Sequence, residues 1–305
     1  MSFSHRAKFG AALLAILFTG VSMPSEAAPK VSKKLLWSQE FVGKAGTTVD
    51  PKFWNFDLGD GTESGIPGWG NQEREYYIPG AVRLDGKSNL LITATRMPVD
   101  PSGQVSATNP YKCYYGTACE WTSGKIHTAG KLGFKYGRIE ARIKTPSGIG
   151  TWPAFWMLGS NLGEVGWPNS GEIDIMEAKG SQPKLSYGTV HGPGYSGGEG
   201  ISGLVKFGKS TSSVYNNYAV EWKPDQIKWL INDRVFFTVN KKDAGSNAWV
   251  FNHEFYLILN LAIGGQFTGE VDPDLKKATL SVDWIRYYSI NGVGELTKYP
   301  TEGTK

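Results

Sequence analysis

Three carboxylates lie close together in the segment GEIDIMEA, residues 171–178. Glu172, Asp174 and Glu177 alternate there with apolar residues, a pattern typical of a strand with one buried face. In a regular strand, Glu172 and Asp174 face one way and Glu177 faces the other way. One extra residue between Asp174 and Glu177, a β-bulge, would place all three carboxylates on one face. We expect this bulge, because bulges often redirect side chains beside active sites.

Carboxylates crowded on one strand face raise one another's proton affinity, so one stays protonated near neutral pH while another is ionised. An ionised nucleophile beside a protonated acid is what glycoside hydrolysis requires. A solvated strand face is one alternative, although such a face more often alternates acids with lysine. A cation site is the other, although calcium prefers ligands from several loops. The acids therefore favour catalysis, but their spacing does not distinguish retention from inversion at the sugar carbon.

The strand that carries these acids belongs to a chain of short strands separated by Gly, Pro, Asn or Asp. Other strand-like runs are Asn89–Thr95, Gly137–Lys144, Tyr218–Trp222, Ile227–Ile231 and Tyr256–Ile263. The second run alternates apolar and charged residues strictly, as a strand with one buried side does. No segment shows a sustained 3.6-residue pattern with caps. We therefore predict an all-β fold, a two-sheet antiparallel β-sandwich.

Composition and charge exclude several other classes of protein. The 305 residues are 20% charged and 13% aromatic, a balance that excludes a disordered chain. The 39 glycines show no Gly-X-Y period, so they fit turns between strands and exclude collagen. The net charge of +4 is small and scattered, so we expect no nucleic-acid partner. Of the 11 tryptophans, we expect Trp229 and Trp284 to lie in the core.

The N-terminal residues 1–27 are predicted to be a signal peptide. A basic start precedes an apolar run from Phe9 to Val21, and residues 25–27 form a small-x-small cleavage pattern. The alternative is a membrane anchor, but the run is short for spanning a bilayer. We expect residues 28–305 to be a single catalytic domain, secreted to the extracellular space or periplasm. We expect this mature chain to be a monomer with no membrane partner.

The segment GEIDIMEA, with Trp167-Pro168 just before it, resembles the active-site strand of glycoside hydrolase family 16. More narrowly, it is similar to bacterial endo-β-1,3-glucanases, or laminarinases. Similar stretches run from about Leu36 to Ser289. They are WSQEF (37–41), GWGNQEREYY (68–77), YGRIEARIKTP (136–146), TWPAFWMLG (151–159), HGPGYSGG (191–198), YLILNLAIGG (256–265) and VDWIRYY (282–288). The resemblance implies a β-jelly-roll with a cleft across its concave sheet, and retaining hydrolysis.

The resemblance also implies a role for each acid. Glu172 would be the nucleophile that forms the glycosyl-enzyme intermediate. Glu177 would be the general acid that protonates the leaving oxygen and then the base that activates water. Asp174 would hydrogen-bond the nucleophile and hold the charge balance. No cofactor is implied for catalysis.

The implied substrate is a polysaccharide, a β-1,3-glucan such as laminarin. One alternative keeps the fold and the reaction but acts on mixed-linkage β-1,3-1,4-glucan or another β-glycan. Sulfated galactans are disfavoured because no Lys/Arg cluster lies next to GEIDIMEA. A non-catalytic glucan-binding protein is the other alternative, but such relatives typically lack the two glutamates.

Sugar rings have flat apolar faces and polar edges, so glycan clefts use aromatic platforms with a few polar groups. We predict seven substrate-binding residues. The resemblance implies Asn71, Arg138, Trp167, His191 and Gln266. Trp152 and Trp156 lie four residues apart on one strand and share a face, so we expect one or both to line the cleft. Trp167 would be the platform beside the scissile sugar, and His191 would lie near the acid/base. Core packing is the alternative for Trp152 and Trp156. A solvated strand face is the alternative for Arg138, and a structural role is the alternative for His191.

The family often carries a structural calcium ion on the convex side. Backbone oxygens of Glu40 and Gly86 and the carboxylate of Asp283 match that pattern. Oxygen ligands from distant segments would suit calcium and would tie the chain ends together.

The two cysteines, Cys113 and Cys119, lie six positions apart in the loop CYYGTAC. Because we expect export to an oxidising compartment, we predict a disulfide between them, with two free thiols as the alternative. Such a short closed loop should stiffen a local feature more than it stabilises the fold. Two cysteines without clustered histidines make no zinc site. The loop does not match the family closely, and we expect it to border the cleft.

Overall fold

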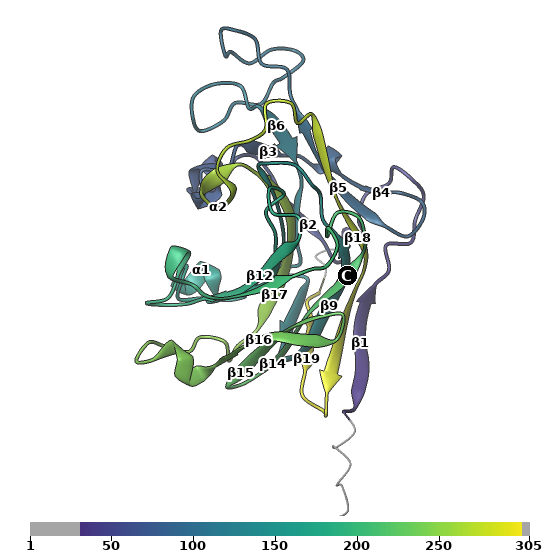
Figure 1. Cartoon of the computed structure of the whole chain (residues 1–305), viewed down its shortest axis with the longest axis vertical. Coiled ribbons are helices and arrows are strands. Elements are labelled where there is room, and N and C mark those ends of the chain that lie inside the picture. Colours follow the sequence, from purple (N-terminus) through teal and green to yellow (C-terminus); the bar gives the residue numbers. More distant parts are fainter. Residues whose placement is uncertain (1–30, 301–305) are drawn as a thin grey trace, which may run out of the picture. The chain divides into compact units, whose positions relative to one another are not determined.

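The computed structural model describes residues 31–300, so the predicted signal peptide, residues 1–27, lies outside the described residues. The described residues from Ser32 onward belong to one compact unit. Almost all regular structure in this unit is β-strand, arranged in two sheets (Figure 1). The predicted all-β class is confirmed.

One sheet has ten strands in the order β16-β15-β14-β9-β18-β5-β6-β3, with β1 beside β18 and β4 beside β5. Its strands are β1 (Lys33–Gln39), β3 (Glu75–Tyr77), β4 (Val82–Leu84), β5 (Leu90–Arg96), β6 (Trp121–Ser123), β9 (Gly137–Lys144), β14 (Asn216–Lys223), β15 (Gln226–Ile231), β16 (Arg234–Asn240) and β18 (Lys277–Ile290). Its neighbouring strands run antiparallel except for the parallel pair β3 and β6.

The other sheet has nine strands in the order β13-β12-β11-β10-β17-β7-β2, with β8 beside β17 and β19 beside β8. Its strands are β2 (Asn55–Asp57), β7 (Lys125–His127), β8 (Leu132–Lys135), β10 (Thr151–Gly159), β11 (Glu172–Glu177), β12 (Leu185–His191), β13 (Ile201–Lys206), β17 (Phe255–Ile263) and β19 (Glu295–Lys298). The nearly all-apolar run that ends at Ile263 therefore forms the central strand β17, as its pattern predicts.

Helical segments are short. They are α1 (Leu162–Val165), α2 (Gly265–Thr268) and the 3₁₀ turns η1 (Thr62–Ser64), η2 (Pro67–Gly70), η3 (Pro79–Ala81), η4 (Gly197–Glu199) and η5 (Lys241–Ala244). Figure 1 shows the nine-stranded sheet curving between the segments that carry α1 and α2. Within residues 31–300, no helix has the length and apolar character needed to cross a membrane.

The core lies between the two sheets, where the inward faces of both pack together. Fully buried apolar side chains include Ile139, Ile143, Ile173, Met176, Val220, Trp229, Leu257 and Leu259. Burying each such side chain away from water stabilises the folded state by about 1.5–3 kcal/mol. Trp229 is thus a core residue, as predicted.

The prediction that Trp284 is a core residue is wrong. Its side chain is only partly buried, and the Arg286 guanidinium lies 4.2 Å from its ring centre. The pairing of β18 with β9 shifts register between Val282 and Trp284. Val282 and Ile285 both point inward, so this bulge turns Trp284 to the outer face.

Strand β11 carries the bulge that the sequence predicts. Asp174 pairs with Thr189 and Glu177 with Tyr187, so three steps along β11 oppose two steps along β12. On the other side, Phe155 of β10 pairs with Met176, and its next residue pairs with Asp174. The skipped residue, Ile175, and its neighbour Met176 are both buried in the core. The acids therefore share the opposite face, the one that the curvature makes concave.

Candidate active site

The three acids of β11 meet polar partners from neighbouring segments. Trp167 Nε1 donates to Glu172 Oε2 at 2.8 Å, and Trp152 Nε1 donates to Glu177 Oε1 at 2.9 Å. His191, opposite Glu172 in the β11–β12 register, places Nε2 3.1 Å from Asp174 Oδ2 and 3.7 Å from Glu172 Oε1. Glu172 and Glu177 thus each have an indole donor that orients them, and Asp174 lies beside the His191 imidazole.

Burial raises the pKa of all three carboxyls. The pKa of Glu172 lies well above its ordinary value because of burial and the nearby Asp174 charge, while the Trp167 N–H opposes this shift. The pKa of Asp174 is raised well above its ordinary value by burial and by the Glu177 charge. Burial also raises the pKa of Glu177, against the Trp152 N–H, which stabilises the ionised form. Each of the three carboxyls therefore holds its proton more tightly than it would in water, and their titrations influence one another.

A chain of hydrogen bonds runs from Trp156, on the same face as the acids, to Asn71. Trp156 Nε1 donates to Asn260 Oδ1 at 2.8 Å, and Asn260 Nδ2 donates to the Tyr77 hydroxyl at 3.1 Å. That hydroxyl donates to Glu73 Oε2 at 3.0 Å, and Glu73 Oε1 accepts from Asn71 Nδ2 at 3.1 Å. This buried network fixes the side chains of Trp156 and Asn71 in the cleft wall.

Helix α2 adds an aromatic contact to Trp152, whose indole donates to Glu177. The Phe267 ring lies 4.9 Å from Trp152 and 5.5 Å from Tyr187, centre to centre. The Lys179 Nζ atom lies 4.0 Å from the same ring. Gln266 is exposed, and its backbone N–H donates to the backbone oxygen of Asn71 at 2.8 Å. Helix α2 is thereby held between the acids and the Asn71 wall.

The structure brings together six of the seven predicted substrate-binding residues, namely Asn71, Trp152, Trp156, Trp167, His191 and Gln266. Trp152 and Trp156 lie on the same face as the acids and are partly exposed, so they are not core residues. Trp167 is 47% exposed and available as a platform. His191 lies beside Asp174 and Glu172, and its imidazole also influences the pKa of Glu177.

Comparison with known proteins agrees with this arrangement. The sequence profile of Glycosyl hydrolases family 16 matches residues 82–286, more than half of the chain. The chain belongs to glycoside hydrolase family 16. A Beta-glucanase of Rhodothermus marinus is 34% identical over 290 residues, which cover 90% of this chain and 92% of that protein.

Solved structures of laminarinases and endo-β-1,3-glucanases resemble most of this chain. The laminarinase catalytic domain of Thermotoga maritima is 40% identical with a TM-score of 0.76, covering 84% of this chain and 98% of that one. The endo-β-1,3-glucanase of Pyrococcus furiosus is 38% identical with a TM-score of 0.76, covering 86% and 99%. An endo-1,3-1,4-beta-glycanase of Rhizobium meliloti is more distant, at 27% identity over 79% of this chain and 48% of that protein.

Arg138 does not reach this family 16 cleft, and its predicted sugar contact is corrected. It lies on β9 of the ten-stranded sheet and is 1% exposed. Its guanidinium contacts Glu140 at 2.5 Å, Asp233 at 2.6 Å and Glu221 at 3.1 Å. The guanidinium donates its hydrogen bonds to these three carboxylates, so Arg138 is neither a sugar ligand nor a solvated strand-face residue.

Among the residues implied for a structural calcium, the side-chain carboxylates of Asp283 and Glu40 are paired with arginines. The carboxylate of Asp283 accepts a hydrogen bond from Arg142. The Glu40 carboxylate accepts two from Arg286, at 2.9 and 3.0 Å. A guanidinium on Asp283, the one predicted side-chain ligand, opposes a dication, so the residues as placed do not fit the site. Calcium binding through Glu40, Gly86 and Asp283 stays a prediction that these contacts do not support.

Within residues 31–300, one group has the ligand types and spacing of a metal site. Ligand atoms of Glu172, Asp174 and His191 all lie within 4.8 Å of one another. The group includes two of the candidate catalytic acids, and one of them, Glu172, already accepts a hydrogen bond from Trp167. A cation there would neutralise the carboxylates that hydrolysis requires.

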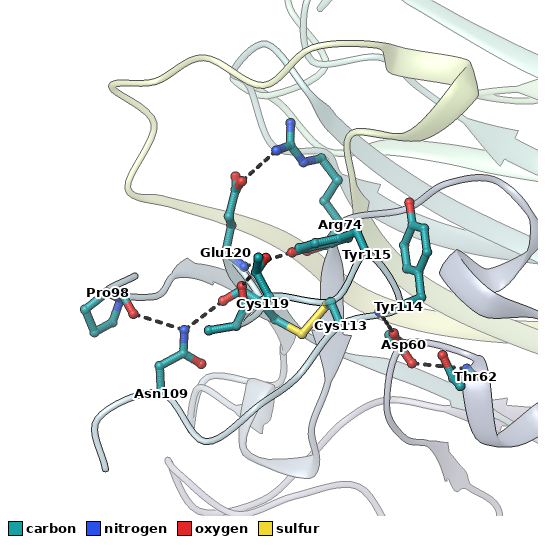
Figure 2. The surroundings of a disulfide bond; sticks show 12 residues. Asp60, Thr62, Arg74, Pro98, Asn109, Cys113, Tyr114, Tyr115, Cys119 and Glu120 are labelled. Carbon is teal, nitrogen blue, oxygen red and sulfur yellow. Dashed lines mark hydrogen bonds and ion pairs between the residues drawn. A yellow bond between two sulfur atoms is a disulfide. The ribbon is translucent and has the colours of Figure 1, made fainter. Parts of the chain in front are cut away.

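The predicted disulfide between Cys113 and Cys119 is present, and both cysteines are buried. Figure 2 shows its loop beside the side chains of Arg74 and Glu120. Arg74 follows directly on the Asn71–Glu73 wall, so the loop lies at one border of the cleft.

Sequence reasoning missed Glu73, Tyr77, Asn260 and Phe267. Glu73 and Tyr77 lie in the stretch GWGNQEREYY and Asn260 in YLILNLAIGG, both of which the sequence singled out. A lone Asn in an otherwise apolar central strand was the available signal, because a buried amide requires a partner.

Proposed function

We propose that this family 16 protein is a retaining endo-β-1,3-glucanase that cleaves laminarin-type glucan by double displacement. The observation that carries the proposal is the bulged strand β11, which sets Glu172, Asp174 and Glu177 on one face. Indole donors at Glu172 and Glu177 hold these two carboxyls at opposite ends of the group.

In the first step, Glu177 donates its proton to the glycosidic oxygen while a carboxylate oxygen of Glu172 attacks the anomeric carbon. The bond from that carbon to the leaving oxygen breaks as the glycosyl-enzyme ester forms. In the second step, Glu177 takes a proton from water, and the water oxygen displaces Glu172 from the same carbon. Two inversions give net retention, and both carboxyls return to their starting protonation states.

The hydrogen bonds support this division of roles, while burial raises the pKa of both glutamates. Burial and the Asp174 charge raise the pKa of Glu172, and His191 and the Trp167 N–H oppose that rise, which favours the ionised form that a nucleophile requires. Burial raises the pKa of Glu177, which keeps this group protonated to higher pH, as a general acid requires. Asp174, between them, shares the proton of the group and lies within hydrogen-bond distance of His191.

The substrate assignment rests on the relatives and on the aromatic cleft. Relatives at 34–40% identity are named for β-glucan or endo-1,3-β-glucan hydrolysis. Trp152, Trp156 and Trp167 supply flat apolar surfaces beside the acids, which suits sugar rings. Mixed-linkage β-1,3-1,4-glucan is the second candidate substrate, because a more distant relative is named for it.

Product profiling on laminarin, lichenan, agarose and carrageenan tests the substrate. We expect laminarin to release a ladder of oligosaccharides, the product pattern of an endo-acting enzyme, with less release from lichenan. No release from agarose or carrageenan is expected. Release from agarose or carrageenan alone would overturn the assignment. Binding to laminarin without release would favour the non-catalytic glucan-binding alternative.

The two glutamate roles are separable by azide rescue on an aryl β-glucoside oligomer with a good leaving group. In Glu172→Ala, azide occupies the vacated space and attacks the anomeric carbon directly, so the product has inverted configuration. In Glu177→Ala, the glycosyl-enzyme still forms and azide attacks it, so the product retains configuration. The opposite pair of configurations would exchange the roles.

We propose that the chain is secreted as a monomer of residues 28–305. The Cys113–Cys119 disulfide supports an oxidising compartment. Mass spectrometry of protein from the periplasm or medium should give an N-terminus at residue 28, and light scattering should give the monomer mass. An uncleaved N-terminus or a dimer would contradict these points.

A further inference from the structure

A cavity of about 510 Å³ opens between helix α2 and the Cys113–Cys119 loop. Its lining includes Arg74, Tyr114, Tyr115, Glu120, Gly265 and Gly269. This volume falls within the range of small-molecule sites, roughly 300–1,000 Å³. None of the three acids lines the cavity, so the catalytic group does not account for it.

We propose that the Cys113–Cys119 loop forms a distal glucan subsite that extends the catalytic cleft past helix α2. Tyr114 and Tyr115 provide the platform for a sugar ring, and the Arg74–Glu120 pair hydrogen-bonds its hydroxyls. The inference rests on the proposed function, because it takes the ligand to be the same neutral β-glucan chain that the acids cleave.

Contacts connect this cavity to the acids through one short element. Trp152, which donates to Glu177, packs against Phe267 of helix α2. Gly265 at the start of α2 and Gly269 just after it line the cavity. A glucan that lies along the cleft past Trp152 therefore meets the loop on the far side of α2.

The loop is held in place before any ligand binds. Asn109 is fully buried, and its Nδ2 donates to the backbone oxygens of Pro98 and Cys119 at 3.0 and 2.9 Å. The backbone N–H of Glu120 donates to the Tyr115 hydroxyl at 3.1 Å, and both appear with the disulfide in Figure 2. A preorganised loop loses little entropy on binding, so its contacts add to affinity.

The Tyr114 ring is placed as a platform. It is 37% exposed and meets Tyr115 edge to face, with ring centres 5.1 Å apart at 77°. Its backbone N–H donates to the buried carboxylate of Asp60. A Cβ at Gly68 would lie 2.8 Å from the ring, and Gly68 has a φ of +60°, so only glycine allows this packing without strain.

The charges around the cavity favour a neutral ligand. Arg74 Nη2 contacts Glu120 Oε1 at 2.6 Å, with side chains 40% and 30% exposed, so the pair can bond sugar hydroxyls. Glu270 also lines the cavity. The lining therefore carries no excess positive charge to attract a sulfated or acidic polysaccharide, whereas a neutral glucan needs the aromatic faces and the paired charges.

The test compares kcat/KM for β-1,3-gluco-oligosaccharides from trimer to octamer. Tyr114→Ala and Tyr115→Ala should lower the value for the octamer about tenfold, the effect of losing a contact worth about 1.4 kcal/mol, and leave the trimer unchanged. Cys113→Ser/Cys119→Ser should show the same length dependence. Tyr299→Ala, which removes an exposed tyrosine that bonds Glu254 outside the cavity, should change neither value.

If the tyrosine variants lost kcat/KM equally on trimer and octamer, or on neither, the subsite proposal would be overturned. A turnover-independent arm measures retention in laminarin-containing gels for Glu172→Gln and for Glu172→Gln/Tyr114→Ala. Weaker retention of the double variant is expected, and equal retention would overturn the subsite. Unmutated protein that fails to hydrolyse laminarin overturns the proposed function alone, and the gel comparison then decides the subsite separately.

Discussion

Each of the two sheets carries a cluster of three carboxylates. One cluster surrounds a positively charged guanidinium, and the other, in the part of the chain that the structure describes, contains no Arg or Lys. On the ten-stranded sheet, Glu140, Glu221 and Asp233 surround the Arg138 guanidinium at 2.5–3.1 Å. Burial of the guanidinium is compensated by charge pairing. Neighbouring opposite charges explain why the pKa of Arg138 is raised despite its burial.

On the nine-stranded sheet, Glu172, Asp174 and Glu177 lie together with no Arg or Lys salt bridge among the described residues. Their partners are indole N–H groups and the His191 imidazole. The indole donors orient Glu172 and Glu177 without adding a positive charge, and burial raises the pKa of all three acids. A crowded acid cluster that lacks a permanent cation is therefore a candidate for catalysis, whereas one that surrounds a guanidinium is structural.

The strongest test of this contrast is Glu172→Gln. We expect kcat to fall about 10³-fold or more, because the amide is not a nucleophile, while the melting temperature does not fall. Assays on laminarin and thermal unfolding measure the two effects. Glu164→Gln, an exposed acid on α1, is the control and should keep full activity. Near-normal activity of Glu172→Gln would remove the nucleophile assignment.

The matching test on the other sheet is Arg138→Met. It leaves three carboxylates without their cation, so we expect the free energy of unfolding to fall by about 3–5 kcal/mol, with kcat of the folded fraction unchanged. Arg142→Met on the same strand breaks a more exposed pair with Asp283 and should cost less than about 1 kcal/mol. Urea unfolding measures both. Lost activity at full stability would instead return Arg138 to the cleft.

A smaller effect should follow from Trp152→Phe, which removes the N–H donor from Glu177. Because that hydrogen bond stabilises the ionised carboxylate, its loss raises the pKa of Glu177. The general acid must be protonated, so the alkaline limb of the kcat/KM profile should move to higher pH. Trp156→Phe, whose lost N–H served Asn260, should leave the limb in place. A shift to lower pH would contradict the acid/base assignment.

The smallest expected effect is on stability in Asp174→Asn. Burial and Glu177 raise the pKa of Asp174, so the folded state binds its proton more tightly than the unfolded state. This tighter proton binding stabilises the folded state below the ordinary aspartate pKa, and the stabilisation is lost as pH rises through the raised pKa. The variant should therefore melt about 2–4 °C higher at neutral pH, the shift that about 1 kcal/mol gives.

This gain should vanish in acid, below the ordinary pKa of 3.8. Asp283→Asn, which breaks the pair with Arg142, is the control and should show no gain at any pH. A lower melting temperature of Asp174→Asn at neutral pH would mean that the contact with His191 outweighs the repulsion.

Local pattern was enough to predict the parts of the fold and site that depend on neighbours in sequence. Alternation and the count of residues between Asp174 and Glu177 predicted the bulge, and shared parity placed Trp152 and Trp156 on one face. These inferences need only the period of a strand.

The features that the sequence did not predict depend on partners that are distant in sequence or on an unmarked bulge. Arg138 was misplaced because two of its three carboxylates come from Glu221 and Asp233, 83 and 95 residues along the chain. Asn260 was missed because its bond to Tyr77 spans 183 residues. Trp284 was misassigned because a bulge reversed its parity, and no residue type marks that bulge.

The bulge at Ile175 also makes the catalytic spacing adjustable by a change in chain length. If Ile175 were deleted, Asp174, Met176 and Glu177 would alternate regularly, and all the acids would still face the cleft. Glu177 would move toward Glu172 by at most one strand step, about 3.3 Å. Insertion and deletion at this one position therefore switch β11 between two discrete distances from Glu172 to Glu177, while the core contacts of Ile173 and Met176 need not change.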